Sequence, residues 1–260
     1  MIPVALTIAG SDPSGGAGIQ ADLKTFHQFG AYGEAVITLV TVQNTAGVSR
    51  VECVRASLVT EQIRAVLDDI PPRAAKTGAL GNVEIVEAVA AIAGEFEFPL
   101  VVDPVMLGKH GAPLVSADAR EAIARLLVPR AYLVTPNLEE AAALTGLEVT
   151  SIERMREAAA RLSEMGAKAA LVKGGHLPGR ATDVLFAAGE WYEFDAPRIE
   201  TRHTHGTGCT YSAAITAELA RGIELTAAVA RAKKFMTEAI RTAPGLGRGS
   251  GPINHHAEIG

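Results

Sequence analysis

Short apolar runs and amphipathic stretches alternate along the whole chain. Apolar runs of strand length are typical of strands buried on both faces of a sheet. They cover residues 4–9, 34–42, 74–77, 100–106, 131–135 and 169–172. Between and after them, apolar residues recur at helical spacing over residues 19–29, 60–70, 83–93, 117–127, 137–146, 150–165, 210–221 and 226–240. This alternation predicts one α/β domain over residues 1–260 with a mainly parallel central sheet.

Capping and turn signals refine these elements. Asn137 with Glu140, and Thr150 with Glu153, have the spacing of a capping box at the start of a helix. Two short runs on either side of Gly189 predict a hairpin. The glycine-rich segment 245–260 predicts a loop draped over the surface.

Composition narrows the class of protein. Apolar residues make up 48% of the 260 residues, so the chain can bury a large core, and a net charge of −5 argues against a nucleic-acid partner. Two cysteines exclude a disulfide framework and a cysteine-rich zinc site. No apolar run reaches membrane length, and the first residues lack the pattern of a secretory signal. We therefore expect a cytoplasmic protein without a membrane partner.

The stretch around Gly206, Gly208 and Cys209 carries the strongest chemical signal. Two glycines leave room for an anion beside the backbone, and the predicted helix that follows points unpaired N–H groups at it. The same field lowers the pKa of a thiol, so we expect Cys209 to be acidified in a phosphoryl-transfer centre. The alternative is a tight turn with a buried, inert cysteine.

Two other glycine-containing stretches resemble nucleotide-binding motifs but lack required features. Residues 16–21 fit a dinucleotide-binding fingerprint, but the gap after the first strand is too long and no acidic residue follows at the required distance. Gly108 and Lys109 are followed by His110, where a phosphate-binding Walker loop needs Ser or Thr. The loop 10–18 is better interpreted as backbone bent around a small ligand.

Polar residues fall repeatedly at the ends of predicted strands. Because parallel strands share one carboxyl edge, these residues are expected to meet there. They are Gln43, Asp103, Asn137, Glu140 and Lys173. The carboxylates suit Mg²⁺ and the lysine suits a phosphate. Asp103 could instead shape a turn, Asn137 could serve only as an N-cap, and Lys173 could be solvated.

These motifs together resemble a known family over nearly the full length. The segments are ALTIAGSDPSGGAGIQADLKT (5–25), TVQNT (41–45), DPVM (103–106), TPNL (135–138), KGGH (173–176) and HGTGCT (205–210). They are similar to the bacterial hydroxymethylpyrimidine/phosphomethylpyrimidine kinases of thiamine biosynthesis. The resemblance implies a ribokinase-like three-layer α/β/α sandwich and a homodimer. It also implies two successive phosphorylations of 4-amino-5-hydroxymethyl-2-methylpyrimidine that use ATP and Mg²⁺.

The resemblance assigns roles to individual residues. Gln43 would hydrogen-bond the pyrimidine edge, in a pocket lined by Gly10, Asp22, Ala79 and Val105. On the nucleotide side, the resemblance implies that Asp103 and Glu140 are metal ligands. It implies that ATP is bound by Asn137, Glu140, Lys173 and Thr207. The anion hole would be formed by Gly206, Thr207 and Gly208. Cys209 takes the position where wider relatives have an aspartate base.

Three departures from the family pattern leave alternatives open. Ala79 stands where methionine is usual and loosens one pocket wall, while His110 and Tyr211 replace a small residue and a leucine. The looser pocket wall leaves a pyridoxal kinase or a dual-specificity kinase as an alternative. A non-catalytic pyrimidine sensor on the same fold is an alternative of another class.

Overall fold

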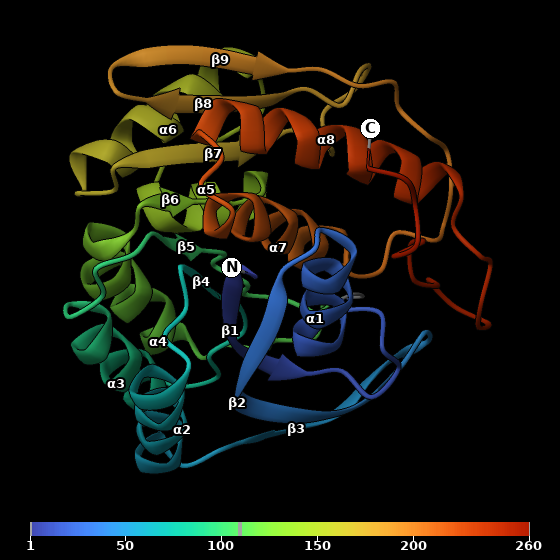
Figure 1. Cartoon of the computed structure of the whole chain (residues 1–260). Helices are drawn as coiled ribbons and strands as arrows, with labels where there is room; N and C mark the ends of the chain where they lie inside the picture. Colours follow the sequence, from blue (N-terminus) through green and yellow to red (C-terminus); the bar gives the residue numbers. More distant parts are fainter. Residues whose placement is uncertain (1, 109–110, 260) are drawn as a thin grey trace.

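The computed structural model describes residues 2–108 and 111–259. Within these residues nine strands form one sheet in the order β3-β2-β1-β4-β5-β6-β7-β8-β9 (Figure 1). The strands are β1 (Val4–Ser11), β2 (Tyr32–Asn44), β3 (Gly47–Cys53), β4 (Ala74–Thr77), β5 (Leu100–Val102), β6 (Leu133–Val134), β7 (Ala169–Lys173), β8 (Asp183–Ala187) and β9 (Glu190–Phe194). Pairing is parallel from β2 through β7, and β3, β8 and β9 add antiparallel edges. The mainly parallel sheet is therefore confirmed.

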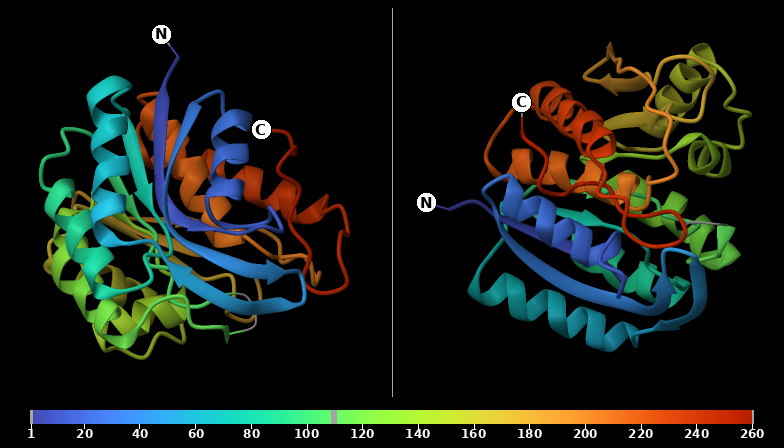
Figure 2. Two further views of the ribbon diagram at one scale, coloured as in Figure 1. Left: turned by 90° about the horizontal axis from the view of Figure 1, so that it is seen from below. Right: turned by 90° about the vertical axis from the view of Figure 1, so that its right-hand side faces the viewer.

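Helices cover both faces of this sheet (Figure 2). They are α1 (Gly18–Gln28), α2 (Ala56–Asp69), α3 (Val83–Ala93), α4 (Ala117–Ala122), α5 (Leu138–Thr145), α6 (Ile152–Glu164), α7 (Thr207–Ala220) and α8 (Leu225–Arg241). Alternate strand residues enter different cores: Val102 packs with α2 to α6, and Val101 packs with α1, α7 and α8. This alternation follows from the two-residue period of a strand and produces three layers.

Some local predictions differ from the structure. Strand β3 was not predicted, because its sequence is polar and it pairs only at the sheet edge. The strand expected at 100–106 ends at Val102, since Pro104 cannot continue a ladder. The expected Thr150 cap is wrong: the side chain of Ser151 accepts the N–H of Arg154. The helix expected at 117–127 turns into a π-helix over Ile123–Leu127.

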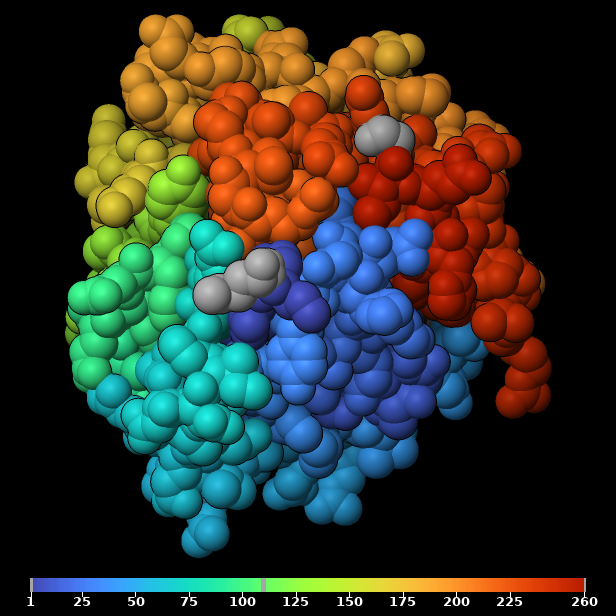
Figure 3. All heavy atoms as spheres, viewed as in Figure 1, coloured from blue at the N-terminus to red at the C-terminus, as the bar shows by residue number. Residues whose placement is uncertain are grey.

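The segment after α8 returns across the molecule to α1 (Figure 3). The Gln28 side chain donates a hydrogen bond of 2.9 Å to the carbonyl of Ala257. The segment predicted as a draped loop is therefore held in place, and we call it the strap. It also passes the β2–β3 turn, where the N–H of Gly249 donates to Oγ1 of Thr45 at 3.2 Å. No helix in the described part of the chain is both long and apolar enough to cross a membrane.

Candidate active site

One large cavity of about 800 Å³ opens at the carboxyl ends of the strands. It contains nearly all the residues selected from the sequence. These are Gly10, Gln43, Ala79, Asp103, Val105, Asn137, Glu140, Lys173, Gly206, Thr207, Gly208 and Cys209. The cavity is built from segments that the sheet topology brings to one edge.

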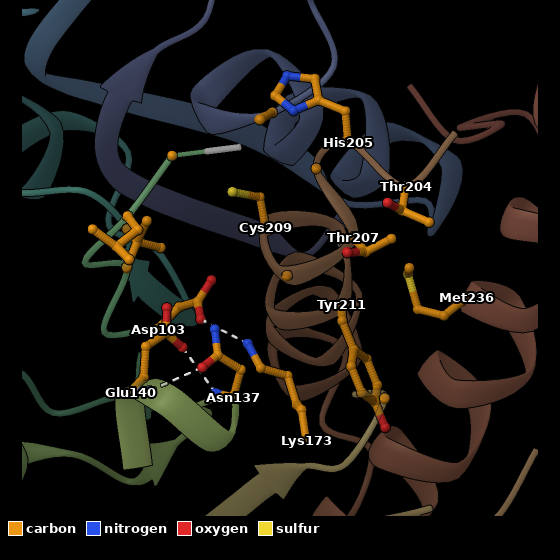
Figure 4. A pocket seen from close by; sticks show the side chains of 18 of the residues that line it. Asp103, Asn137, Glu140, Lys173, Thr204, His205, Thr207, Cys209, Tyr211 and Met236 are labelled. Atoms are coloured by element: carbon orange, nitrogen blue, oxygen red, sulfur yellow. Dashed lines mark hydrogen bonds and ion pairs between the residues drawn. The ribbon is translucent and has the colours of Figure 1, made fainter. Parts of the chain in front are cut away.

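The N-terminus of α7 lies in the middle of this cavity (Figure 4). Gly206 precedes the helix with a φ of 80°, and a Cβ built there would lie 1.7 Å from the carbonyl oxygen of Gly16. Only glycine satisfies both the left-handed backbone and this close approach. No described side chain caps the helix. The N–H of Thr207 donates to the carbonyl of Thr204 at 3.4 Å, and the N–H groups of Gly208 and Cys209 that follow it point toward an anion in the cavity.

A charged cluster faces this helix end. The Nζ of Lys173 lies 3.1 Å from Oδ1 of Asp103, whose Oδ2 accepts from Ser212 at 3.0 Å. Burial opposes ionisation of Asp103, but the two lysines, Lys173 and Lys76, and these hydrogen bonds hold its pKa below the usual value. The cluster therefore presents a carboxylate and an ammonium side by side at the edge of the sheet.

Asn137 and Glu140 form the predicted capping box of α5. The Asn137 side chain accepts the N–H of Glu140 at 2.9 Å, and Glu140 accepts the N–H of Asn137 at 2.8 Å. Burial raises the pKa of Glu140 to about 7, against the opposing effect of Lys173. The capping role and the position in the cavity coexist, so the two interpretations are not exclusive.

The carboxylate oxygens of Asp103 and Glu140 could supply part of the coordination shell of Mg²⁺. No group of three or more His, Cys, Asp or Glu side chains in the described chain could hold a metal by itself. Mg²⁺ at phosphates commonly takes one or two protein carboxylates and completes its shell with phosphate and water. Asp103 and Glu140, both on this cavity, fit that donor set.

Cys209 differs from the expectation in one respect. The thiol faces the cavity from the first turn of α7 (Figure 4), but loss of hydration raises its pKa to about 12. Lys76 and the N–H of Gly18 favour the thiolate, while Asp22 and Asp103 oppose it. The predicted acidification is therefore wrong, because burial outweighs the helix field.

Asp22 is the one selected residue that lies outside the cavity. It is fully buried, with Oδ2 2.9 Å from Nζ of Lys76 and 2.6 Å from Oγ1 of Thr7. Lys76, which the sequence analysis did not select, has no exposed side-chain surface. Its signal was a lysine inside the apolar strand 74–77.

The part of the cavity around Gln43 contains two further residues that were missed. Asp12 and His205 line it beside Gln43, and Nε2 of His205 lies 2.7 Å from Oδ2 of Asp12. Gly10 and Ala79 form the adjoining wall: a Cβ at Gly10 would lie 3.7 Å from that of Ala79. These residues come from segments far apart in the sequence, so spacing could not reveal them.

The cavity also reaches α8 and the segment after β9. Tyr211 and Met236 line it there (Figure 4), and the Lys233 ammonium lies 2.6 Å from Asp183. One cavity therefore includes Gln43, the N-terminus of α7 and residues of α8.

A family model described as phosphomethylpyrimidine kinase matches residues 12–254. The chain belongs to this family. It is 45% identical over 256 residues to the hydroxymethylpyrimidine/phosphomethylpyrimidine kinase of Bacillus subtilis, covering 97% of this chain and 94% of that one. It is 50% identical over 252 residues to the thiamine biosynthesis bifunctional protein ThiED of Geobacter sulfurreducens, covering 96% of this chain but about half, 51%, of that relative.

Solved structures extend the likeness to the fold. A phosphomethylpyrimidine kinase from Clostridium difficile superposes with a TM-score of 0.82 at 44% identity, covering 92% of this chain and 100% of that one. Bacillus subtilis pyridoxal kinase, as its ADP complex, superposes with a TM-score of 0.91 at 38% identity, covering 99% and 98%. The expected ribokinase-like three-layer α/β/α sandwich is thereby confirmed for this phosphomethylpyrimidine kinase family member.

Proposed function

We propose that this chain phosphorylates 4-amino-5-hydroxymethyl-2-methylpyrimidine and then its monophosphate with ATP, in thiamine diphosphate biosynthesis. The observation that carries the proposal is that one cavity includes Gln43, the N-terminus of α7 and residues of α8. His205, which contacts Gln43, lies on one side in Figure 4 and Tyr211 and Met236 lie on the other, with Thr207 and Cys209 of the α7 N-terminus between them. The substrate hydroxyl and the γ-phosphate of ATP would meet there.

The residues around the N-terminus of α7 suit phosphoryl transfer, which depends mainly on positioning and charge stabilisation. The N–H groups at the start of α7 and the Lys173 ammonium would hold the transferring phosphoryl oxygens. Asp103 and Glu140 would hold Mg²⁺, which when bound neutralises phosphate charge. Cys209 would act on the substrate hydroxyl, with Lys76 as the buried cation that favours its thiolate.

The test is ADP release with ATP and Mg²⁺ in parallel assays of four compounds: the hydroxymethylpyrimidine, its monophosphate, pyridoxal and pyridoxine. Turnover of both pyrimidines with weak turnover of both B6 compounds supports the proposal. Binding of the pyrimidine without ADP release would refute the kinase and leave a non-catalytic sensor.

A pyridoxal or dual-specificity kinase is the second candidate. The structure of Staphylococcus aureus pyridoxal kinase with AMP-PCP and pyridoxal superposes with a TM-score of 0.90 at 35% identity, covering 99% of this chain and 95% of that one. The small Ala79 in the pocket wall is the feature of this chain that favours it. Turnover led by pyridoxal would establish this alternative.

A cytoplasmic homodimer is part of the proposal. The β2–β3 hairpin extends the sheet, and on it Val40 and Val42 are 46% and 58% exposed. An apolar surface of this kind is suited to a second copy of the chain. Sedimentation of the purified protein tests it, with Val42→Asp as the variant expected to dissociate the pair.

A further inference from the structure

The amide of Gln43 has a partner on each side at the substrate end of the cavity. In the structure its Nε2 lies 3.2 Å from Nε2 of His205, and its Oε1 lies 3.2 Å from Oγ1 of Thr41. The carbonyl oxygen of an amide accepts hydrogen bonds and its nitrogen donates them, so its orientation must be assigned from its partners. That orientation decides which pattern of groups the cavity presents to a ligand.

The His205 side requires the amide oxygen. Burial opposes ionisation of Asp12, but hydrogen bonds from His205 and Ser14 hold its pKa below the usual value, so it is a carboxylate that only accepts. Nε2 of His205, 2.7 Å from this carboxylate, must therefore carry a hydrogen. A protonated ring nitrogen cannot accept a hydrogen bond from the Gln43 nitrogen, but it can donate a second, shared bond to the oxygen.

The Thr41 side requires the amide nitrogen. The single hydrogen of the Thr41 hydroxyl has two acceptors within reach, the carbonyl of Ser11 at 3.0 Å and Oε1 of Gln43 at 3.2 Å, and the shorter contact is the one to Ser11. Its oxygen then offers Gln43 only lone pairs, which suit an N–H donor. Both neighbours therefore favour the amide rotated by 180° from its orientation in the structure, with the oxygen beside His205 and the nitrogen beside Thr41.

We propose that Asp12 and His205 are positioning residues that lock the Gln43 amide and so set ligand specificity. One lone pair of the oxygen and one hydrogen of the nitrogen remain for the cavity. The ligand therefore meets an acceptor on the His205 side and a donor on the Thr41 side. An exocyclic amino group next to an unprotonated ring nitrogen complements this order, as in an aminopyrimidine. The inference rests on the proposed function and names the group that selects its substrate.

The discriminating ligand is the 4-oxo analogue of the hydroxymethylpyrimidine. It presents a carbonyl acceptor next to a ring N–H, which reverses the order and needs a rotated amide. We expect the parent protein to prefer the 4-amino compound in kcat/KM by roughly 100-fold or more, since mismatched buried polar groups discriminate strongly. The preference is measured by ADP release and, independently, as the ratio of the two Kd values by titration calorimetry.

Three variants distinguish a role of His205 in positioning the Gln43 amide from a general loss of structure. His205→Leu removes the ring donor, and we expect the preference to fall at least about tenfold because the amide is free to rotate. His205→Gln keeps an N–H donor of similar reach and should stay within about threefold of the parent. His203→Leu is the matched control: it removes a histidine two positions before His205 that accepts the N–H of Gly251 at 3.2 Å but does not line the cavity. It should leave the preference unchanged.

The outcomes are decisive in each case. A folded His205→Leu protein that keeps the full preference overturns the inference while the proposed function stands. If His205→Leu does not fold, Thr41→Val removes the other partner, and an unchanged preference there overturns it equally. If the parent turns over neither pyrimidine, the proposed function fails, and the Kd ratios still decide whether the amide is locked.

Discussion

Lys76 and Asp22 form an ion pair closed off from solvent. The Nζ of Lys76 lies 2.9 Å from Oδ2 of Asp22, and neither side chain has exposed surface. Burial by itself lowers the pKa of Lys76, but the negative charge of Asp22, with smaller contributions from Cys209 and Asp103, raises it overall. The pair thus places a permanent cation behind the cavity, close enough to Cys209 to influence its thiol.

Removing one partner should leave an uncompensated buried charge. We expect Lys76→Met to lower the free energy of unfolding by about 3–5 kcal/mol. The double variant Lys76→Met/Asp22→Asn should recover a large part of this loss, because no lone charge remains. Urea unfolding of the single and double variants measures it. Simple additivity of the two single changes would contradict the prediction.

Cys209 should matter more in the first transfer than in the second. The first substrate is a neutral alcohol, which benefits from a general base, whereas a phosphate monoester with a second pKa of about 6 is already ionised at neutral pH. Cys209→Ala should therefore reduce kcat for the alcohol more than for the monophosphate. Cys53→Ala, which changes the exposed cysteine, is the control. Equal losses in both steps would indicate a structural role.

Lys173 should contribute to transfer as well as to folding. Its side chain is 13% exposed at the cavity, but that of its partner Asp103 is only 1% exposed, so Lys173→Met should also lower the free energy of unfolding. We expect Lys173→Met to lower kcat/KM by about 100-fold or more, the size seen when one charge-stabilising donor is lost. Thermal unfolding and ADP release are measured together. Retention of activity within about threefold of the parent would exclude Lys173 from the reaction.

Gly206 and Gly222 provide a matched pair of left-handed glycines. Both have a φ of 80°, but a Cβ at Gly206 meets the Gly16 carbonyl at 1.7 Å, and one at Gly222 meets no described atom within 4 Å. Alanine at either position adds about 1–2 kcal/mol of backbone strain. Gly206→Ala should destabilise the protein further, by about 1–3 kcal/mol, and disturb the anion site. Equal effects would show that the loop at Gly16 yields.

His255 should make stability depend on pH. Burial lowers its pKa to about 4, and its Nε2 lies 3.1 Å from Oγ1 of Thr210, next to Cys209. The unfolded chain, with a pKa near 6.5, binds this proton first. Stability should therefore fall as pH drops from 6.5 toward 4, by up to about 3 kcal/mol from this group. His255→Gln should flatten that part of the curve, and an unchanged slope would refute the assignment.

Most of the fold and much of the candidate site could be predicted from the sequence alone. Strand length and helical period identified the alternating elements, since these depend on local side-chain pattern. Most of the polar residues after strand ends, including Gln43, Asp103, Asn137 and Lys173, do line one cavity, because parallel strands must end at a common edge. The polar edge strand β3 carried no such pattern and was missed.

Tertiary structure alone decided which groups meet and in what state. Asp12 and His205 are 193 positions apart, yet they make a 2.7 Å contact beside Gln43. Cys209 keeps its proton although it sits at a helix N-terminus, because hydration is lost when the surrounding segments close around it. Local sequence determines backbone conformation and the donors a segment carries. Desolvation and pairing depend on what packs against that segment, so they are settled only when distant segments come together.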